Sequence, residues 1–357
     1  MTRKFPPSVG GMQTLAAGVW RAVRSTSPDA VLLAHGGSNR GLATFLPVAV
    51  ARTAVLLARR RVGYVLCGDA AMYAVLAPVL RVCRVRHAAM VMGLDLTYGN
   101  PVYRAVVHPL LRRAPCVIAI SEATAETARA FGIPADRVAV IRLGVESPDV
   151  AGPDRETARR RIGARIGVAE DAVVLLTLGR LVRRKGARWF VEGVLPRLPA
   201  EVVYVLAGDG EEFEPVRQAA ERAGVTDRVR LLGHVDDADR EMLMRGADLF
   251  VQPNIRVPGD MEGFGLVTVE AAMRGTPVVA AALEGILDAV VDGETGVLLP
   301  PEDADAWVAR LGQIVADPEA LAAAGARAAV ESRSRYSESR MQAAFVALLQ
   351  PGGSPGR

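Results

Sequence analysis

The sequence predicts an α/β protein with two doubly wound domains, each built on a parallel sheet. At 357 residues the chain is longer than one hydrophobic core usually fills. Half of its residues are hydrophobic but only 5% are aromatic, which suits short Val- and Ala-rich strands packed under helices. Short apolar runs alternate with longer helical stretches, a pattern that favours parallel sheets over hairpins.

The strand candidates are short apolar runs that end at turn residues. In the first half of the chain they are residues 30–34, 64–67, 87–92 and 116–120, and in the second half 173–178, 202–207, 229–232, 249–252 and 278–281. Residues 146–154 contain two prolines and a glycine and are the expected linker. We therefore expect an N-terminal domain at 1–148, a second domain at 149–330, and a C-terminal helix at 331–350 that crosses back to the first domain, ahead of a disordered tail to 357.

The most informative motif is Glu262-Gly-Phe-Gly-Leu-Val-Thr-Val-Glu270, in which two carboxylates flank a turn that opens a helix. It lies between two strand candidates, so it belongs at the carboxyl ends of parallel strands, where doubly wound sheets bind ligands. A glycine turn at a helix start presents unpaired N–H groups and a positive dipole end, which suit a diphosphate. The carboxylates suit pairs of hydroxyls, on a sugar for Glu262 and on a ribose for Glu270. Taken alone, the alternative is an acidic loop followed by a solvated Glu.

A basic turn follows the strand candidate 173–178. It begins with Gly179-Arg180 and ends with Lys185-Gly186, so that both cations can face one anion. A departing nucleoside diphosphate builds up negative charge, which fixed Arg and Lys side chains stabilise without a metal. The alternative is a basic surface turn. Asp, Glu and His residues with metal-ligand spacing are not evident, so we expect no metal and no cofactor.

Four segments of the second half, with a fifth that also matches, form a recognisable series. They are Gly179-Arg180 with Lys185-Gly186, Ala207-Gly-Asp-Gly-Glu211, Leu232-Gly-His-Val235, Glu262 to Glu270 with the following Ala-Ala-Met-Arg-Gly275-Thr-Pro-Val, and Asp292-Gly-Glu-Thr-Gly296-Val-Leu-Leu. This series resembles the retaining glycosyltransferases of family four, the "glycosyl transferases group 1" type. The resemblance implies the GT-B fold, in which two Rossmann-like domains face a central cleft, with the donor on the second domain and the acceptor on the first.

The resemblance also implies roles for single residues. Arg180 and Lys185 match the pair that contacts the donor diphosphate, Glu262 matches the carboxylate that holds the donor hexose, and Glu270 matches the ribose-binding Glu. The other expected donor-site positions in this half are Gly179, Gly208, Val235, Gly263, Phe264, Gly265 and Leu266. A usual Gly-Gly turn is replaced by Glu284-Gly285, and Asp288 stands where a Glu is common; we expect these changes to adjust packing more than chemistry.

The first half departs from the family in two places. Gly10-Gly11, before a helix at 12–24, resembles the acceptor-side loop that closes over the donor phosphate, and alone it would be an ordinary turn. The apolar strand that should precede this loop is missing from residues 1–4, so we expect either a sheet without its central strand or, as the favoured hypothesis, a start codon upstream. Met92 stands where relatives commonly have His, which puts acceptor-side assistance in doubt.

Two polar residues near these departures are worth following. Asp95 is the nearest candidate to orient an acceptor hydroxyl, and the alternative is that it caps the turn from Leu96 onward. Ser121 is expected to cap the helix that follows it.

The distribution of charge and the composition indicate which kinds of partner the protein binds. Residues 1–150 carry 18 Lys and Arg against 8 Asp and Glu, which fits either an anionic acceptor or membrane surface, or merely solvated helices. The arginines are dispersed without interleaved aromatics, so nucleic acid is not expected. Three scattered cysteines and the apolar stretch 41–58, interrupted by Pro47 and Arg52, favour a cytoplasmic protein with at most peripheral membrane contact.

The expected activity is transfer of a hexose from a UDP- or GDP-sugar to a hydroxyl of a lipid-linked, glycan or natural-product acceptor, with retention and without metal. The alternatives are a nucleotide-sugar-binding protein with little turnover and a GT-B epimerase or phosphorylase. Oligomeric state is not indicated by the sequence.

Overall fold

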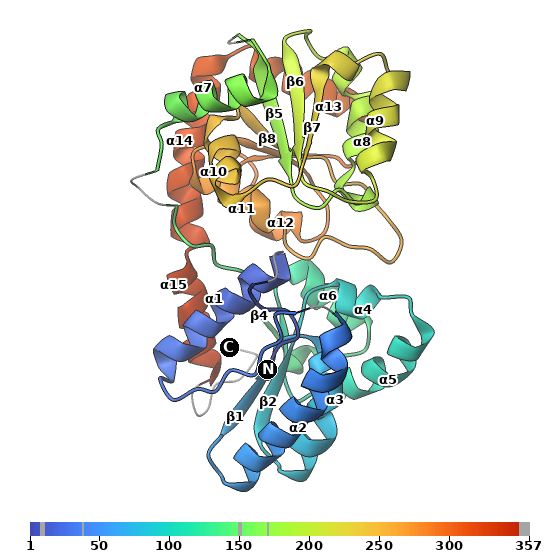
Figure 1. Ribbon diagram of the computed structural model, residues 1–357, viewed down its shortest axis with the longest axis vertical. Helices are drawn as coiled ribbons and strands as arrows, with labels where there is room; N and C mark the ends of the chain where they lie inside the picture. The colour runs from blue at the N-terminus through green and yellow to red at the C-terminus, as the bar shows by residue number, and fades with distance from the viewer. Residues whose placement is uncertain (8–10, 38, 149–151, 170, 350–357) are drawn as a thin grey trace. The chain divides into compact units, whose positions relative to one another are not determined.

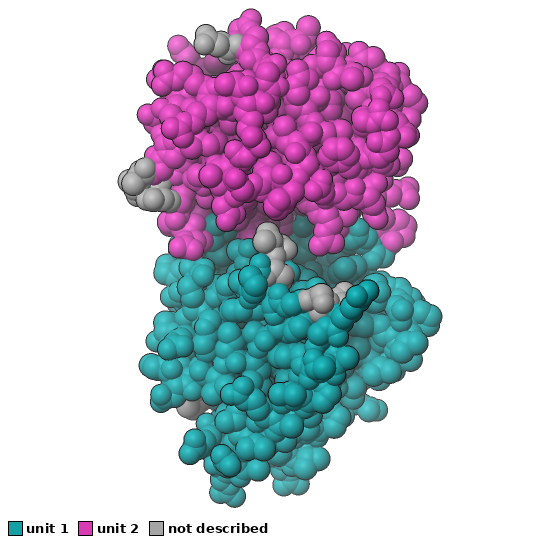
Figure 2. Space-filling model, in the orientation of Figure 1, with its two compact units in different colours: residues 1–145, 259–264, 336–357 teal, residues 146–258, 265–335 magenta. Residues whose placement is uncertain are grey.

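The computed structural model describes residues 1–7, 11–37, 39–148, 152–169 and 171–349. Its contacts divide the chain into two compact units, coloured separately in Figure 2. Unit 1 comprises Met1–Val145, Gly259–Phe264 and Tyr336–Arg357, and unit 2 comprises Glu146–Pro258 and Gly265–Arg335. The chain therefore passes from one unit to the other four times, and the short piece 259–264 separates the two parts of unit 2.

Unit 1 is built on a four-stranded parallel sheet in the order β1-β2-β3-β4 (Figure 1). Its strands are β1 (Tyr64–Cys67), β2 (Arg86–Val91), β3 (Val117–Ala119) and β4 (Val138–Val140). Its helices are α1 (Gly11–Thr26), α2 (Leu42–Ala58), α3 (Ala70–Val82), α4 (Leu94–Thr97), α5 (Pro101–Leu111), α6 (Glu122–Ala130) and α15 (Glu338–Leu349), with short 3₁₀ turns at Asn39–Gly41 and Ala135–Arg137. Buried side chains of β1, β2, β3, α3 and α5 form one core, which fixes the carboxyl ends of the strands at a common edge.

The strand expected at 30–34 is wrong. Only Ala34 pairs, through a single parallel bridge to Thr2, whose N–H donates to the carbonyl of Leu33 at 3.0 Å. On its other side, the carbonyl of Met1 accepts from the N–H of Gly68 at 2.7 Å, so Met1 and Thr2 lie between this segment and the end of β1. Since the pairing of residues 30–34 is limited to the one bridge between Thr2 and Ala34, this segment does not form a strand.

A cavity of about 760 Å³ lies in unit 1 beside this short ladder. Its walls come from α1, α2, α15, residues 29–33 and the outer edge of β1, and its lining is mostly apolar. The apolar residues that line the cavity include Leu15, Ala16, Val19, Trp20, Leu33, Leu56, Val65 and Met90. A volume of this size is within the range of ligand pockets, about 300–1,000 Å³.

Unit 2 is built on a six-stranded parallel sheet in the order β10-β9-β8-β5-β6-β7. The strands are β5 (Val173–Leu178), β6 (Val202–Ala207), β7 (Val229–Gly233), β8 (Leu249–Gln252), β9 (Val278–Ala281) and β10 (Val297–Leu299). Strand order reverses between β5 and β8, and such a switch point is where doubly wound sheets bind ligands beyond the carboxyl ends of their strands.

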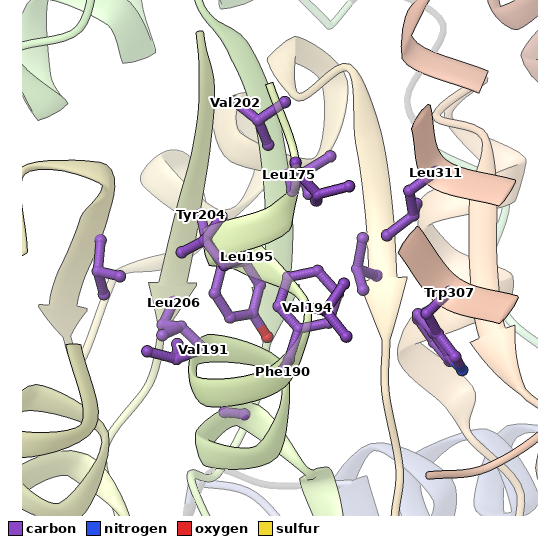
Figure 3. Packing of buried hydrophobic residues seen from close by; sticks show 14 of the residues in the cluster. Leu175, Phe190, Val191, Val194, Leu195, Val202, Tyr204, Leu206, Trp307 and Leu311 are labelled. Carbon is purple, nitrogen blue, oxygen red and sulfur yellow. The ribbon is translucent and has the colours of Figure 1, made fainter. Parts of the chain in front are cut away.

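Helices cover both faces of this sheet (Figure 1). They are α7 (Arg155–Ile166), α8 (Ala187–Gly193), α9 (Phe213–Arg222), α10 (Asp237–Gly246), α11 (Leu266–Met273), α12 (Ile286–Ala289), α13 (Ala304–Val315) and α14 (Pro318–Arg335), with 3₁₀ turns at Arg183–Lys185, Leu195–Arg197 and Thr226–Arg228. Figure 3 shows the core beneath α8 and α13, where the ring of Phe190 lies 4.7 Å from Tyr204 and 6.1 Å from Trp307 between ring centroids. This packing fixes α8, and with it the basic turn that precedes the helix.

The other sequence-based elements agree with the structure in most places. The remaining eight predicted strands are confirmed to within one residue at each end, while β4 and β10, of three residues each, were not expected. The prediction of a single helix at 331–350 is wrong, because the structure has two helices there. Helix α14 ends at Arg335 and α15 begins at Glu338, and between them the carbonyl of Tyr336 accepts from the N–H of Val145 at 2.8 Å. The tail 350–357 lies outside the described residues. Within the described ranges, no helix is long and apolar enough to cross a membrane.

Candidate functional site

In unit 2, the turns after β5, β6 and β7 lie against one another at the carboxyl edge of the sheet. The N–H of Gly179 donates to the carbonyl of Ala207 at 2.9 Å, and that of Gly208 to Gly233 at 2.7 Å. A Cβ added at Gly208, whose φ is +140°, would stand 2.1 Å from the carbonyl oxygen of Gly179. Glycine is thus required at Gly208 by the close approach of two backbones, and Arg180, which follows Gly179, is exposed at this edge.

The turn that carries Lys185 is pressed against the loop after β8. Gly186 has a φ of +68°, and a Cβ there would stand 1.8 Å from the carbonyl oxygen of Pro253. The N–H of Ile255 donates to the carbonyl of Arg184 at 2.9 Å. Lys185 itself is buried, with 8% of its surface exposed. The switch point between β5 and β8 therefore carries a fixed cation on a rigid turn.

The carboxylate of Glu270 is held by an arginine of a neighbouring helix. Glu270 lies in α11, is 7% exposed, and accepts a hydrogen bond from Arg240 of α10 at one oxygen. Arg274 donates to the carbonyl of Glu270 at 2.9 Å and pairs with Glu241 at 2.7 Å. Burial raises the pKa of Glu241, but hydrogen bonds from Arg245 and Arg274 outweigh it, so that its pKa lies below the ordinary value. The network holds the side chain of Glu270 in place, and a carboxyl group has enough lone pairs to accept from hydroxyls as well.

Gly265 stands directly before helix α11, in the left-handed conformation with φ +85°, and no side chain caps this helix start. The first-turn N–H groups of α11 thus suit an anion. The altered turn ahead of α12 places Glu284 at φ +51°, a conformation that usually belongs to glycine, and Asp288 is buried in α12. Of the predicted donor positions in unit 2, Leu266 is the first residue of α11 and Val235 is half-buried just before α10.

The structure assigns Glu262, Gly263 and Phe264 to unit 1, although the rest of their motif belongs to unit 2. A Cβ added at Gly263 would stand 2.4 Å from the carbonyl oxygen of Met92, at the end of β2. The hydroxyl of Thr124 donates to the carbonyl of Gly263 at 3.4 Å. Glu262 is 9% exposed. The loop 259–264 therefore lies at the carboxyl ends of β2 and β3, beside Met92.

Beneath this loop, unit 1 holds a buried group of charges. Asp69 follows β1, is fully buried, caps α3 by accepting from the N–H of Met72 at 2.9 Å, and pairs with Arg3 at 3.1 Å. Asp95 lies in α4 and accepts from the N–H of Met92 at 3.2 Å, so the alternative that it caps the turn from Leu96 onward is wrong. Burial, followed by the nearby charge of Asp69, raises the pKa of Asp95 to about 7.

The remaining predicted positions of unit 1 are less constrained. Gly10 lies outside the described residues. Gly11 opens α1, and a Cβ there would meet no protein atom within 4 Å, so its expected approach to a phosphate stays a prediction. Ser121 accepts from the N–H of Thr124 at 3.0 Å, which confirms that it caps α6.

Comparison with known proteins identifies the family. A family model described as "Glycosyl transferases group 1" matches residues 158–330, and one described as "Glycosyltransferase Family 4" matches residues 3–147. The chain belongs to these glycosyltransferases. It is 29% identical over 350 residues to the GDP-mannose-dependent alpha-(1-6)-phosphatidylinositol monomannoside mannosyltransferase of Mycolicibacterium smegmatis, covering 91% of each chain.

Other relatives match over shorter stretches. The glycosyltransferase chain is 35% identical over 258 residues to the D-inositol 3-phosphate glycosyltransferase of Xylanimonas cellulosilytica, which covers 69% of this chain and 59% of that protein. It thus spans about three fifths of that relative's length. Among solved structures, Anabaena Alr3699/HepE in complex with UDP and glucose superposes with a TM-score of 0.79 over 98% of both chains at 20% identity. This likeness confirms the GT-B fold.

Sequence reasoning missed several residues of the glycosyltransferase's two sheet edges. Asp69 follows a strand just as Asp95 does, so its position after Cys67-Gly68 was a usable signal. No sequence signal identified Arg240 or Met261, because their contacts join residues far apart in the sequence. In the parts of the chain that the structure describes, no group of three or more His, Cys, Asp or Glu residues has the arrangement of a metal site.

Proposed function

We propose that this chain is a retaining, metal-independent glycosyltransferase that moves a hexose from a UDP- or GDP-sugar to a hydroxyl acceptor. The observation that carries the proposal is the carboxyl edge of the unit 2 sheet, where the backbone turns lie against one another, Lys185 is buried on the turn after β5, and Glu270 is held in α11, the helix that follows β8. These are the chemical groups that a nucleoside diphosphate needs: cations and N–H groups for its phosphates, and a carboxylate for its ribose.

Each group has a role in the proposed reaction. Arg180 and Lys185 neutralise the diphosphate as the bond from the anomeric carbon to the phosphate oxygen breaks. Glu270 accepts from the ribose hydroxyls with the oxygen that Arg240 leaves available. Glu262 accepts from hydroxyls of the hexose. A new bond then forms from the anomeric carbon to the acceptor oxygen on the same face, and the acceptor proton passes to the leaving phosphate oxygen.

Metal independence is supported by the cations of the basic turn. Charge on a leaving diphosphate has to be neutralised, and a rigid turn that fixes Lys185 supplies that charge without reorganisation. The substitution of Met92 for the more common His removes an imidazole from the acceptor side. A reaction in which the leaving phosphate takes the proton does not need that imidazole.

The acceptor class is suggested by the relatives and by charge. Two relatives are named for phosphatidylinositol mannoside and for inositol 3-phosphate as acceptors. The excess of Lys and Arg over Asp and Glu in residues 1–150 suits such anionic groups. We therefore propose an inositol-containing, lipid-linked or similarly anionic acceptor, with peripheral attraction to anionic membranes through unit 1.

The test is a panel of UDP- and GDP-hexoses scored for hydrolysis and for transfer to inositol phosphates and phosphatidylinositol, with and without EDTA. Turnover of one donor, unaffected by EDTA and with the anomeric configuration retained, is the expected result. Lys185→Ala should lower kcat by about 10²–10³, the usual loss for one transition-state charge partner. Arg183→Ala, an exposed cation in the same turn, is the matched control and should stay close to wild type. Binding without any turnover would instead favour a nucleotide-sugar-binding protein.

A further inference from the structure

The turn at the end of β2 is anchored from below by Asp95. Gly93, with φ +92°, reverses the chain between Met92 and α4, and the carboxylate of Asp95 reaches back across this turn to the N–H of Met92. Asp95 is 7% exposed, so little water competes for this hydrogen bond. The position of the Met92–Gly93 turn therefore depends on where the Asp95 carboxylate is held.

Asp95 is itself held by charged groups from other elements. Asp69 at the end of β1 and Arg3 near the N-terminus face it, and both bear on its titration. From α5, Tyr103 interacts electrostatically with Asp95, and His108 bonds to its backbone. Asp95 thus lies in a buried place near one guanidinium and a second carboxylate, and the charge of Asp69 disfavours ionisation of Asp95.

The upper side of the same turn supports the loop that carries Glu262. A Cβ at Gly93 would stand 3.0 Å from the side chain of Met261, and one at Gly263 would stand 2.4 Å from the carbonyl oxygen of Met92. The loop is tied to neighbouring helices as well, since Thr97 donates to the carbonyl of Gly259 at 3.2 Å. Residues before and after Glu262 therefore rest directly on Met92 and Gly93.

We propose that Asp95 is a positioning residue, which through the Met92–Gly93 turn fixes the loop that presents Glu262 to the donor hexose. This inference rests on the proposed function for the role of Glu262, but its structural part does not. It assigns Asp95 to the hexose side of the donor rather than to direct contact with an acceptor hydroxyl.

The arrangement also makes the positioning sensitive to pH. With burial and Asp69 raising the pKa of Asp95 to about 7, the carboxyl is protonated in mild acid and ionised above neutrality. Ionisation strengthens the bond to the Met92 N–H and adds repulsion toward Asp69. Hexose transfer should therefore change with pH across neutrality in a way that Asp95→Asn, which cannot ionise, does not reproduce.

The experiment compares Asp95→Asn and Asp95→Ala with Asp136→Asn and Asp136→Ala, which make the same changes at an exposed site of unit 1. Asp95→Ala should raise KM for the nucleotide sugar about tenfold or more, as a small misplacement of a contacting group does, while the Kd for free UDP or GDP stays unchanged. Asp95→Asn should flatten the pH profile. A wild-type pH profile in Asp95→Asn, or an unchanged KM in Asp95→Ala, would overturn the proposal.

A readout without substrate separates this proposal from the proposed function. Asp95→Ala should raise amide hydrogen exchange in a peptide covering residues 259–264, whether or not any nucleotide sugar is turned over, and unchanged exchange there would refute the positioning role. Should Asp95→Ala fail to fold, Met261→Ala removes the contact from the loop side. It should raise KM for the nucleotide sugar while the pH profile stays that of wild type, and a wild-type KM would count against the proposal.

Discussion

Replacing Gly186 by alanine should be far more damaging than the same replacement at Gly224. Both glycines belong to unit 2 and have nearly equal dihedral angles, with φ of +68° and +67°. They differ in their surroundings, because a Cβ at Gly186 would stand 1.8 Å from the carbonyl oxygen of Pro253, whereas one at Gly224 would meet nothing within 4 Å. The pair therefore separates backbone strain from steric overlap.

The magnitudes follow from these two terms. A left-handed conformation costs an L residue about 1–2 kcal/mol, and alanine recovers about 0.4–1 kcal/mol by restricting the unfolded chain, so Gly224→Ala should cost about 1 kcal/mol. At Gly186 the Cβ and the Pro253 oxygen must also separate from 1.8 Å to at least 3.0 Å. Overpacking of side chains costs about 1–3 kcal/mol, and here the obstacle is backbone, so a total of about 3–4 kcal/mol is expected.

Thermal unfolding and nucleotide binding provide the assay. In a domain of this size each kcal/mol shifts Tm by about 2–4 °C, so Gly186→Ala should lower Tm by roughly 10 °C and Gly224→Ala by roughly 3 °C. Because the turn that holds Lys185 must move, Gly186→Ala should also weaken binding of UDP or GDP, which Gly224→Ala should leave intact. Equal losses of Tm in the two variants would refute the argument from close backbone approach.

Three further results are expected. The pKa of Asp95 is raised to about 7, from about 4 in the unfolded chain, so the stability that this residue contributes is present below pH 4 and is lost as pH rises to about 7. Between pH 5 and pH 8, the unfolding free energy of wild type, measured in urea, should fall by a few kcal/mol relative to that of Asp95→Asn. Parallel dependences of the unfolding free energy on pH in the two proteins would contradict this. Ala16→Leu adds apolar volume at the lining of the unit 1 cavity and should raise Tm by a few degrees, as cavity filling commonly does. Ala17→Leu, on the same helix but outside the cavity lining, is the control and should not raise Tm. An unchanged or lower Tm for Ala16→Leu would show that the space is already occupied. Arg240→Ala leaves the mostly buried carboxylate of Glu270 without its arginine partner and should lower the unfolding free energy, measured in urea, by about 1–2 kcal/mol. If the pair were only a surface contact, 1 M salt would screen it and would lower the unfolding free energy of wild type by the same amount.

Much of unit 2 could be predicted from the sequence because its signals are local. The strands 173–178 and 202–207 are continuous apolar runs that end in Gly179 and Gly208, and the structure has the same bounds. Buried parallel strands give such runs, and the turns that follow need glycine where backbones meet. Lys185 and Glu270 were likewise proposed from local motifs, the basic turn after a strand and the two carboxylates around a glycine turn, and their roles stay predictions.

The rest depends on contacts between distant parts of the chain. Nothing near Glu262 indicates that Met261 packs on Gly93 or that Gly263 lies against Met92, so the motif read as one segment is divided between the two units. The pairing of Arg240 with Glu270 joins two helices and leaves no pattern in either. Residues 30–34 have the composition of a strand but only Thr2 beside them, and a strand forms only where a partner ladder exists.

The fourfold passage of the chain between the units limits how the protein can be taken apart genetically. A gene fragment ending near Val145 encodes the sheet of unit 1 but lacks the loop 259–264 and helix α15, with its Arg21–Glu338 ion pair to α1. A fragment covering 146–335 carries the loop without the surface on which it rests. Half-molecules and two-fragment complementation are therefore poor tools for assigning donor and acceptor binding in this enzyme, and point substitutions in the intact chain are the appropriate ones.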